Sequence, residues 1–317
     1  MTEMRVRRAF TLVELLIAIV ITGFVMSAVI TLFFSVFKNY ELHQDISSAK
    51  QRGHIALALI QPFVLNAGLG LPPDNASDPQ AFQRAFVDIP PLEPLFPAQQ
   101  NQRFSSFVQL AEIQSSGEMT VSAASEASAL WLVYSISSGT GVDKGFEPRR
   151  GVVLDIPIRG TLDLQHVAAY TPDTPNPLKS WVVFPSATTP LLVQNIGSGG
   201  TVRIMRFLSN LDDKVLPLDE MRFVRAVKIF VSGTSLIVNR LDGSSGQTVA
   251  DGIAGMWCRF DQNERVLTVY ILARADTRRE PGVQGALDGW PAAADVRWPR
   301  DAAYRYAVVS RSWRIRN

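Results

Sequence analysis

The apolar positions of this chain follow three successive patterns, and each pattern predicts a different kind of element. The first is an apolar run that carries no charge from Leu15 to Phe37. An α-helix rises about 1.5 Å per residue, so this run gives roughly 34 Å of helix, enough to cross a hydrocarbon layer about 30 Å thick. The run therefore predicts a membrane-spanning helix near the start of the chain.

The second pattern begins beyond Phe37, where apolar and small residues recur at alternating spacings of four and three. The positions are Leu42, Ile46, Ala49, Gly53, Ala56, Ile60 and Phe63. This spacing places them on one face of a helix, and we expect that face to pack on the protein's own sheet. Gly68 and Gly70 are expected to end the helix. Together the two patterns predict one continuous helix from Phe10 to Asn66.

The third pattern is a series of apolar runs, several of them alternating, that are typical of strands. The expected strands are Leu130–Ser135, Val152–Ile156, Trp181–Phe184, Val202–Leu208, Val224–Val231, Ser235–Arg240, Val266–Ala273 and Tyr304–Ile315. Ser232-Gly233-Thr234 predicts a hairpin between the fifth and sixth of these. Residues 72–103, rich in Pro, Gln and Asn, are expected to form a long surface connection. A spine helix followed by an antiparallel β-sheet predicts one α+β domain.

The charge distribution indicates how the membrane helix is oriented, and the cysteine content excludes an internal disulfide. The formal net charge of the 317-residue chain is only +2, too small to indicate nucleic-acid binding from bulk electrostatics. However, Arg5, Arg7 and Arg8 gather just before the apolar run, so the N-terminus is expected to stay cytoplasmic and the rest to lie across the membrane. Cys258 is the single cysteine, so no internal disulfide can form, and we expect an inert, buried thiol.

Glu14 is the most informative residue, because it places an acid near the start of an otherwise uncharged apolar helix. A charge inside a membrane costs several kcal/mol unless it is paired, and such residues are usually functional. A secretory signal peptide would have an apolar region of about 7–15 residues and a cleavage site after it, and this run is longer. A plain single-span anchor explains the length and the arginines, but it does not explain the acid.

These residues resemble the class III signal of type IV pilins and of type II secretion pseudopilins: the arginine cluster, then Ala9-Phe10-Thr11, then Glu14. The resemblance implies that a prepilin peptidase cleaves between Ala9 and Phe10 and that Phe10 is then N-methylated. Glu14 becomes the fifth residue of the mature chain, where its carboxylate can neutralise the N-terminal amine of a neighbouring subunit. Ala9 stands where the family usually has glycine, and Thr31 stands near the place where major pilins often have a helix-bending proline.

The resemblance implies a pilin-like α+β fold with four parts. They are a cleaved cytoplasmic leader (1–9), a transmembrane and fibre-core helix (10–37), the soluble half of the spine helix (38–68) and a periplasmic or extracellular β-rich domain (69–317). Shorter segments look like W-type minor pilins and J-type pseudopilins. These are Asn66-Ala67-Gly68, Ile237–Arg240, Gln247–Ile253, Trp257–Phe260 and the terminal Arg316-Asn317.

For function, the resemblance implies a minor pilin that starts assembly of a type IV pilus and sits at its tip. Its expected partners are other minor pilins and the major pilin, reached through the N-terminal helix, together with the prepilin peptidase and inner-membrane lipid. The protein is expected to wait in the inner membrane, with its soluble domain in the periplasm, before it joins the pilus at the cell surface. The alternatives are a J-type pseudopilin of a type II secretion system, a tip subunit for adhesion or DNA uptake, and a plain membrane-anchored periplasmic protein.

The chain contains no motif that predicts catalysis, so we expect no enzyme, no cofactor and no metal. It lacks Cys-x-x-Cys, His-Glu-x-x-His and Gly-x-Ser-x-Gly, and ATP hydrolysis is assigned to a separate motor. Asp212-Asp213 lacks the regular acidic spacing of a calcium loop and is expected to be a solvated turn. A role in DNA uptake requires an exposed basic and aromatic patch. The candidates for it are Arg278, Arg279, Trp290, Arg297, Trp298 and Arg300.

Overall fold

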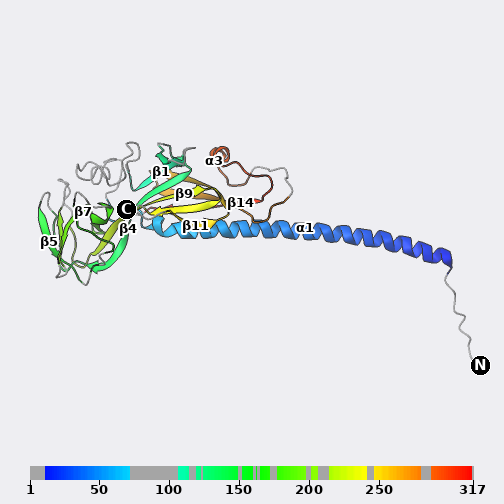
Figure 1. Cartoon of the computed structure of the whole chain (residues 1–317), viewed down its shortest axis with the longest axis horizontal. Coiled ribbons are helices and arrows are strands. Elements are labelled where there is room, and N and C mark those ends of the chain that lie inside the picture. Colours follow the sequence, from blue (N-terminus) through cyan, green and yellow to red (C-terminus); the bar gives the residue numbers. More distant parts are fainter. Residues whose placement is uncertain are drawn as a thin grey trace, which may run out of the picture.

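The computed structural model shows a long helix that projects from a β-rich body (Figure 1). It describes residues 11–71, 106–113, 119–122, 124–148, 152–159, 162, 165–171, 177–197, 201–205, 214–240, 246–279 and 287–315. The body is made of two antiparallel sheets, and the helix packs on them with its C-terminal half. This confirms the predicted α+β arrangement of a long N-terminal helix on antiparallel β-sheet.

Helix α1 (Leu12–Leu65) is 54 residues long and continues without a break from its exposed half into the body. Thr11 is its N-cap and Asn66 its C-cap. Its buried residues are Asp45, Ala49, Gly53, Ala56, Leu57, Ile60 and Val64. Four of the predicted stripe residues are thus fully buried, and Leu42, Ile46 and Phe63 are half-buried. The stripe is confirmed as the face that packs on the protein's own sheets.

The larger sheet has ten strands in the order β2-β1-β4-β9-β6-β7-β8-β5, with β10 paired to β9 and β11 paired to β10. Their bounds are β1 (Val108–Ile113), β2 (Met119–Val121), β4 (Ala129–Gly141), β5 (Val153–Pro157), β6 (Trp181–Phe184), β7 (Ala187–Ile196), β8 (Thr201–Met205), β9 (Glu220–Ser232), β10 (Ser235–Arg240) and β11 (Gln247–Asp251). A short 3₁₀ helix, η2 (Pro177–Ser180), precedes β6.

The smaller sheet has four strands in the order β14-β13-β12-β3. They are β3 (Glu126–Ala127), β12 (Ile253–Asp261), β13 (Val266–Arg274) and β14 (Tyr306–Arg314). Helix α1 packs mainly on β14, β13 and β11, so it crosses from the small sheet to the edge of the large one. A short helix, α3 (Ala292–Arg297), lies between β13 and β14 in the chain.

The hydrophobic core has two main clusters, one under α1 and one in a second lobe. We call the described residues between 142 and 219 the distal lobe; its strands β5 and β7 lie beyond the C-terminal end of α1 (Figure 1). Its core is made of Val142, Ile156, Ile158, Val167, Val182, Phe184, Ala187, Leu191, Val193 and Val215, with Met221 and Phe223 of β9. The helix N-terminus and the distal lobe are therefore at opposite ends of the molecule.

All eight predicted strands overlap observed ones, and Trp181–Phe184 and Ser235–Arg240 match residue for residue. The hairpin is confirmed: Ser232 pairs with Ser235, and Gly233 between them has a φ of 62°, which glycine adopts without strain. Strands β1, β2, β3, β7, β11 and β12 were not among the predicted strands, and neither was α3, which lies in an expected loop. The expected connection over residues 72–103 lies outside the described residues.

Candidate functional site

The N-terminal half of α1 is an apolar surface without cover. Every residue from Leu12 to Tyr40 is exposed. Within the helix, an 18-residue window of mean hydropathy 2.7 has none of its residues buried in the protein. Among the described residues, this is the one helix long and apolar enough to cross a membrane. An apolar surface of this extent requires lipid or partner helices around it.

Glu14 and Thr11 form a capping box at the first turn of this helix. The backbone N–H of Thr11 donates to Glu14 Oε2 (3.1 Å), and the Thr11 hydroxyl donates to the same oxygen (3.0 Å). The backbone N–H of Glu14 in turn donates to Thr11 Oγ1 (3.2 Å). A carboxylate is stabilised at a helix N-terminus by the helix dipole. Glu14 is thus held in place within a single subunit.

The second carboxylate oxygen, Glu14 Oε1, accepts no hydrogen bond from any residue that the structure describes. A carboxylate has room for about four hydrogen bonds, so Glu14 can accept another donor while it keeps its cap. The predicted processing residues Ala9 and Phe10 lie outside the described residues, and so does Asp212-Asp213. Cleavage and methylation at Phe10 therefore stay predictions.

The soluble half of α1 carries an apolar stripe on the side that faces away from the sheets. We call Ile55, Ala58, Leu59, Pro62 and Leu65 the outward stripe. Ile55, Leu59 and Leu65 keep 48%, 41% and 51% of their surface exposed. The five residues of the outward stripe recur at spacings of three and four, which puts them on one face of the helix. The exposed positions of the helix between Tyr40 and Ile55 are polar, so the outward stripe is an apolar surface separate from that of the first half of α1.

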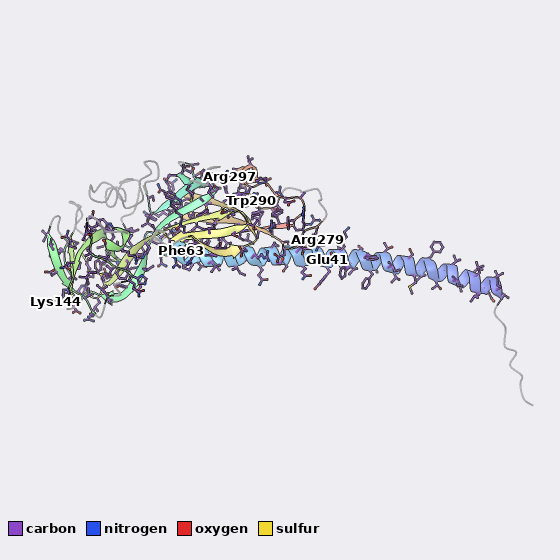
Figure 2. All side chains as sticks on the ribbon, in the orientation of Figure 1. Glu41, Phe63, Lys144, Arg279, Trp290 and Arg297 are labelled. Carbon is purple, nitrogen blue, oxygen red and sulfur yellow. The ribbon has the colours of Figure 1, made fainter. Side chains whose placement is uncertain are left out.

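Two sets of ion pairs fasten α1 to the chain segment that follows β13. Arg279 contacts Glu41 (2.7 Å) and Asp45 (2.5 Å), and Asp276 pairs with Arg52 two turns further along the helix. Hydrogen bonds from Arg279 to Asp45 and then to Glu41 raise the pKa of the guanidinium above its already high ordinary value. We call these five residues the clasp. Figure 2 shows Arg279 beside Glu41 where the helix leaves the body.

The helix end is joined to the large sheet by the segment Asn66-Ala67-Gly68. Ala67 forms a β-bridge with Tyr134, and the N–H of Gly68 donates to the carbonyl of Val133 (3.1 Å). Gly68 has a φ of 76°, and a Cβ there would lie 2.8 Å from the Phe107 ring. These two constraints explain why this position of the family-like segment is glycine.

Gln247–Ile253, another of the segments that look like W-type and J-type subunits, forms β11 and the turn into β12. Gly252 at this turn has a φ of 73°, and the Arg52 guanidinium lies against it so closely that a Cβ would be 2.5 Å from Arg52 Nη1. The carbonyl of Gly252 accepts from the N–H of Arg274 (2.7 Å). The segment therefore carries the chain from the large sheet to the small one directly under α1.

The six residues considered as candidates for a basic and aromatic patch do not form one exposed patch, because most of them make contacts inside the protein. Arg279 belongs to the clasp, Arg297 donates to the carbonyl of Ile113, and Arg300 pairs with Asp295 (3.3 Å). The Trp290 side chain is buried in a cluster with Trp257 and Leu272, and the Trp298 N–H donates to the carbonyl of Met256 (2.9 Å). Of the six candidates, only Arg278 is an exposed side chain.

The single cysteine fits a structural role. Cys258 is fully buried in β12, and burial raises the pKa of its thiol. His43 and His54 are exposed on α1. Within the described ranges, no group of three or more His, Cys, Asp or Glu side chains is placed to hold a metal ion.

Sequence reasoning missed the clasp. Its one local signal was Asp45, an acid beside the predicted apolar face of the helix, which requires a cation nearby. Nothing in the sequence indicates that the cation is Arg279, because the two residues are separated by most of the chain. The outward stripe was also missed, although its spacing was visible in the sequence.

Comparison with known proteins gives one result, at the N-terminus. A family model described as the prokaryotic N-terminal methylation motif matches residues 4–30. No curated protein and no solved structure matches the chain. The matched residues include the arginine cluster, Glu14 and the first half of the apolar run.

Proposed function

We propose that this chain, whose residues 4–30 match the prokaryotic N-terminal methylation motif, is a type IV pilin-like protein and a minor pilin of W type. In this proposal it is a structural subunit that initiates assembly of a type IV pilus and sits at the tip of the fibre. The motif implies processing by a prepilin peptidase, which we place between Ala9 and Phe10, with N-methylation of Phe10. The motif and the apolar helix indicate anchoring in the inner membrane before assembly.

The observation that carries the proposal is the exposed first half of α1, rigidly continuous with the helix that is the spine of the body. An apolar helix of this kind is stable in lipid, and it is equally stable among the apolar helices of other subunits. When the helix leaves the lipid and joins the helices of other subunits, the attached body moves with it as one rigid unit. The protein is therefore built to be transferred from the membrane into a fibre.

In this proposal Glu14 sets the height at which neighbouring helices align in the fibre. Its carboxylate is fixed by Thr11 and keeps one oxygen for a further donor. The positive amine that cleavage creates at Phe10 of a neighbouring subunit is such a donor. Each charge alone is costly to bury in an apolar bundle, so the two are stable there only when they meet. Neighbouring helices would therefore align at one relative height.

The body favours a minor subunit over a role in nucleic-acid binding. The basic and aromatic residues considered for DNA uptake stabilise the segment around α3 instead. The hairpin and helix-end segments that look like W-type and J-type subunits are the ones that join α1 to both sheets. The J-type pseudopilin of a type II secretion system shares this helix and these joints, and it is the second candidate.

The first experiment is mass spectrometry of the mature N-terminus, from cells with and without the prepilin peptidase. We expect an N-methylated Phe10 that is present only with the peptidase. An intact leader in both strains would contradict the assembly mechanism. In a strain that lacks this chain, loss of surface pili with normal protein secretion indicates the minor pilin, and the reverse indicates the pseudopilin.

A further inference from the structure

The distal lobe contains a turn in which a leucine occupies a position that favours glycine. Leu216, Pro217, Leu218 and Asp219 form a β-turn, closed by a hydrogen bond from the Asp219 N–H to the Leu216 carbonyl (3.2 Å). Leu218 has a φ of 68°, and a proline followed by a residue of positive φ is typical of a type II turn. A leucine in this conformation is strained, and such strain clusters at functional sites. We call residues 216–219 the distal turn.

The strained backbone is held from two sides. The Leu218 N–H donates to the Val142 carbonyl (2.9 Å), and the Val142 N–H donates to the Asp219 carbonyl (3.0 Å). On the other side, the Ser186 N–H donates to Asp219 Oδ2 (3.1 Å), and Ser186 Oγ accepts from the Leu216 N–H (3.2 Å). The turn is therefore fixed before any partner binds, which lowers the entropy cost of binding.

The two leucine side chains of the distal turn are not used in the core. Leu216 and Leu218 keep 51% and 63% of their surface exposed, and neither belongs to the core of the distal lobe. Outside α1, the described residues include three other exposed large apolar side chains, Val152, Val153 and Val296. Glycine in place of Leu218 would relieve the strain and leave the core intact. A contact outside this chain therefore explains the leucine better than the fold does.

The distal turn lies at the far end of the molecule, on the side of the outward stripe. Val215 forms a β-bridge with Phe146, and Leu218 is bonded to Val142, so the turn lies beside the segment that carries Lys144. Figure 2 shows Lys144 beyond the C-terminal end of α1 and on the side of the helix away from the sheets. The outward stripe faces the same side. A neighbouring subunit that lies along the stripe would therefore reach the distal turn.

The charges beside the distal turn are of both signs. Lys214 lies 3.9 Å from Glu147, and Arg159 pairs with Asp143. An excess of positive charge, which a polyanion or an anionic lipid surface would require, is thus absent from these described residues. Two leucines on a fixed turn instead suit an apolar pocket of another protein, because burial of apolar surface needs no matching charge.

We infer that Leu216 and Leu218 anchor the distal lobe to the body of a neighbouring pilin-like subunit, the same subunit that packs on the outward stripe. The outward stripe and the distal turn lie on one side of the molecule, and this continuity favours a subunit of the fibre over a protein outside it. The inference rests on the proposed function, and it goes beyond it by naming the surface and the anchor residues.

The test places the photo-crosslinker p-benzoylphenylalanine in the full chain in cells, in place of Leu59, Leu218 or Val296 in turn. Leu59 belongs to the outward stripe, and Val296 is exposed on α3, on the opposite side of the body from α1 (Figure 1). We expect the first two positions to crosslink to one and the same protein, identified by mass spectrometry as a subunit with a processed, N-methylated N-terminus. The Val296 position should not give this product.

Substitutions in the turn separate the side chains from the backbone. With the crosslinker at Leu59, Leu216→Ser/Leu218→Gly should lower the yield of this product by about tenfold. Leu218→Gly alone should also lower the yield, yet the chain should unfold at a urea concentration no lower than the parent's, because glycine accepts a positive φ. Arg265→Gly is the matched control. Arg265 is the other described non-glycine residue with a positive φ (54°), and its replacement should leave the yield unchanged.

A Leu218→Gly chain that unfolds at a lower urea concentration would assign the leucine to the fold, and an unchanged yield would show that it makes no contact; either result overturns the inference. A Leu218 product without a prepilin N-terminus also overturns it, because the partner would lie outside the fibre. If Leu59 gives the subunit and Leu218 gives no product, only the distal contact fails and the proposed function stands. An unprocessed N-terminus, with no subunit product from either position, contradicts the proposed function and the inference with it.

Discussion

Gly53 is the residue at which the spine helix comes closest to the small sheet. A Cβ at this position would lie 2.2 Å from Val309 Cγ2 and 3.5 Å from the Ala273 Cβ. Alanine is a better helix former than glycine by about 1 kcal/mol, so propensity alone predicts that Gly53→Ala stabilises the protein. Overpacking of a full site costs about 1–3 kcal/mol, and we expect it to decide the outcome.

We therefore predict that Gly53→Ala lowers the free energy of unfolding of the body by about 1–2 kcal/mol, measured by chemical denaturation. Val309→Ala in the same chain should recover part of the loss, because it removes the methyl group that the new Cβ meets. Gly23→Ala is the matched control: nothing lies within 4 Å of a Cβ there. A stabilised Gly53→Ala variant would show that the helix moves away from the sheet at no cost.

Cys258 provides a second prediction at this scale. An unfolded cysteine has a pKa of about 8.5, whereas burial keeps the folded thiol protonated at higher pH. The folded state therefore loses stability relative to the unfolded state as the pH rises above about 8.5, where the unfolded thiol ionises. We expect alkylation at pH 9 to be slow in the folded protein and fast in denaturant, as followed by mass spectrometry. Fast alkylation of the folded chain would contradict a buried thiol.

At the scale of elements, the sequence was informative where a periodic pattern extends over a whole element. Helix α1 and strand β10 were predicted because their burial follows the period of their apolar residues, and β6 because it is a short, continuous apolar run. Strand β7 was missed because Pro190 within it argues against a strand. The role of Trp298 could not be predicted, because its N–H donates to Met256, a residue on another element that only the fold brings near.

The capping box at the start of α1 allows the two roles of Glu14 to be separated. Glutamine at this position keeps an oxygen for the Thr11 N–H but carries no charge, whereas alanine removes both. We predict that Glu14→Gln is processed and anchored normally but is absent from sheared fibres, as measured by immunoblot of the membrane and fibre fractions. Glu14→Ala should also lose the cap, at a cost to the helix of about 0.5–2 kcal/mol. Normal fibre incorporation of Glu14→Gln would show that its charge has no role in assembly.

The outward stripe gives the other prediction for α1. Ile55 and Leu59 are partly exposed in the subunit, so Ile55→Arg/Leu59→Arg should change the free energy of unfolding by no more than about 0.5 kcal/mol per site. If neighbouring subunits pack along this face, the same variant should be depleted from fibres. Ser310→Arg adds a charge to an exposed position on β14 and is the control. Equal incorporation of the two variants would exclude the stripe as a contact.

At the scale of the whole molecule, the two core clusters share strands but lie on different sides of them. On β6, Trp181 and Val183 belong to the cluster under α1, whereas Val182 and Phe184 belong to the distal cluster. Strands β4 and β9, 13 residues each, run from one lobe into the other. The distal lobe is therefore attached to the body through continuous strands and has a core of its own, at the end of the molecule furthest from the membrane.

This arrangement predicts that the distal lobe can open without the body. Phe184 is fully buried, and its ring meets Phe146 edge-on at 5.7 Å, so Phe184→Ala should cost about 3–5 kcal/mol. We expect faster hydrogen exchange confined to β5, β7 and the start of β9, because α1 packs on β11, β13 and β14 and takes no support from the distal core. Leu57→Ala, also in a buried site, should instead raise exchange in the soluble half of α1 and the strands beneath it. Equal loss of protection in both lobes with Phe184→Ala would show that β4 and β9 make the molecule a single cooperative unit. A partner that binds the distal lobe would then also stabilise the strands that pack on α1.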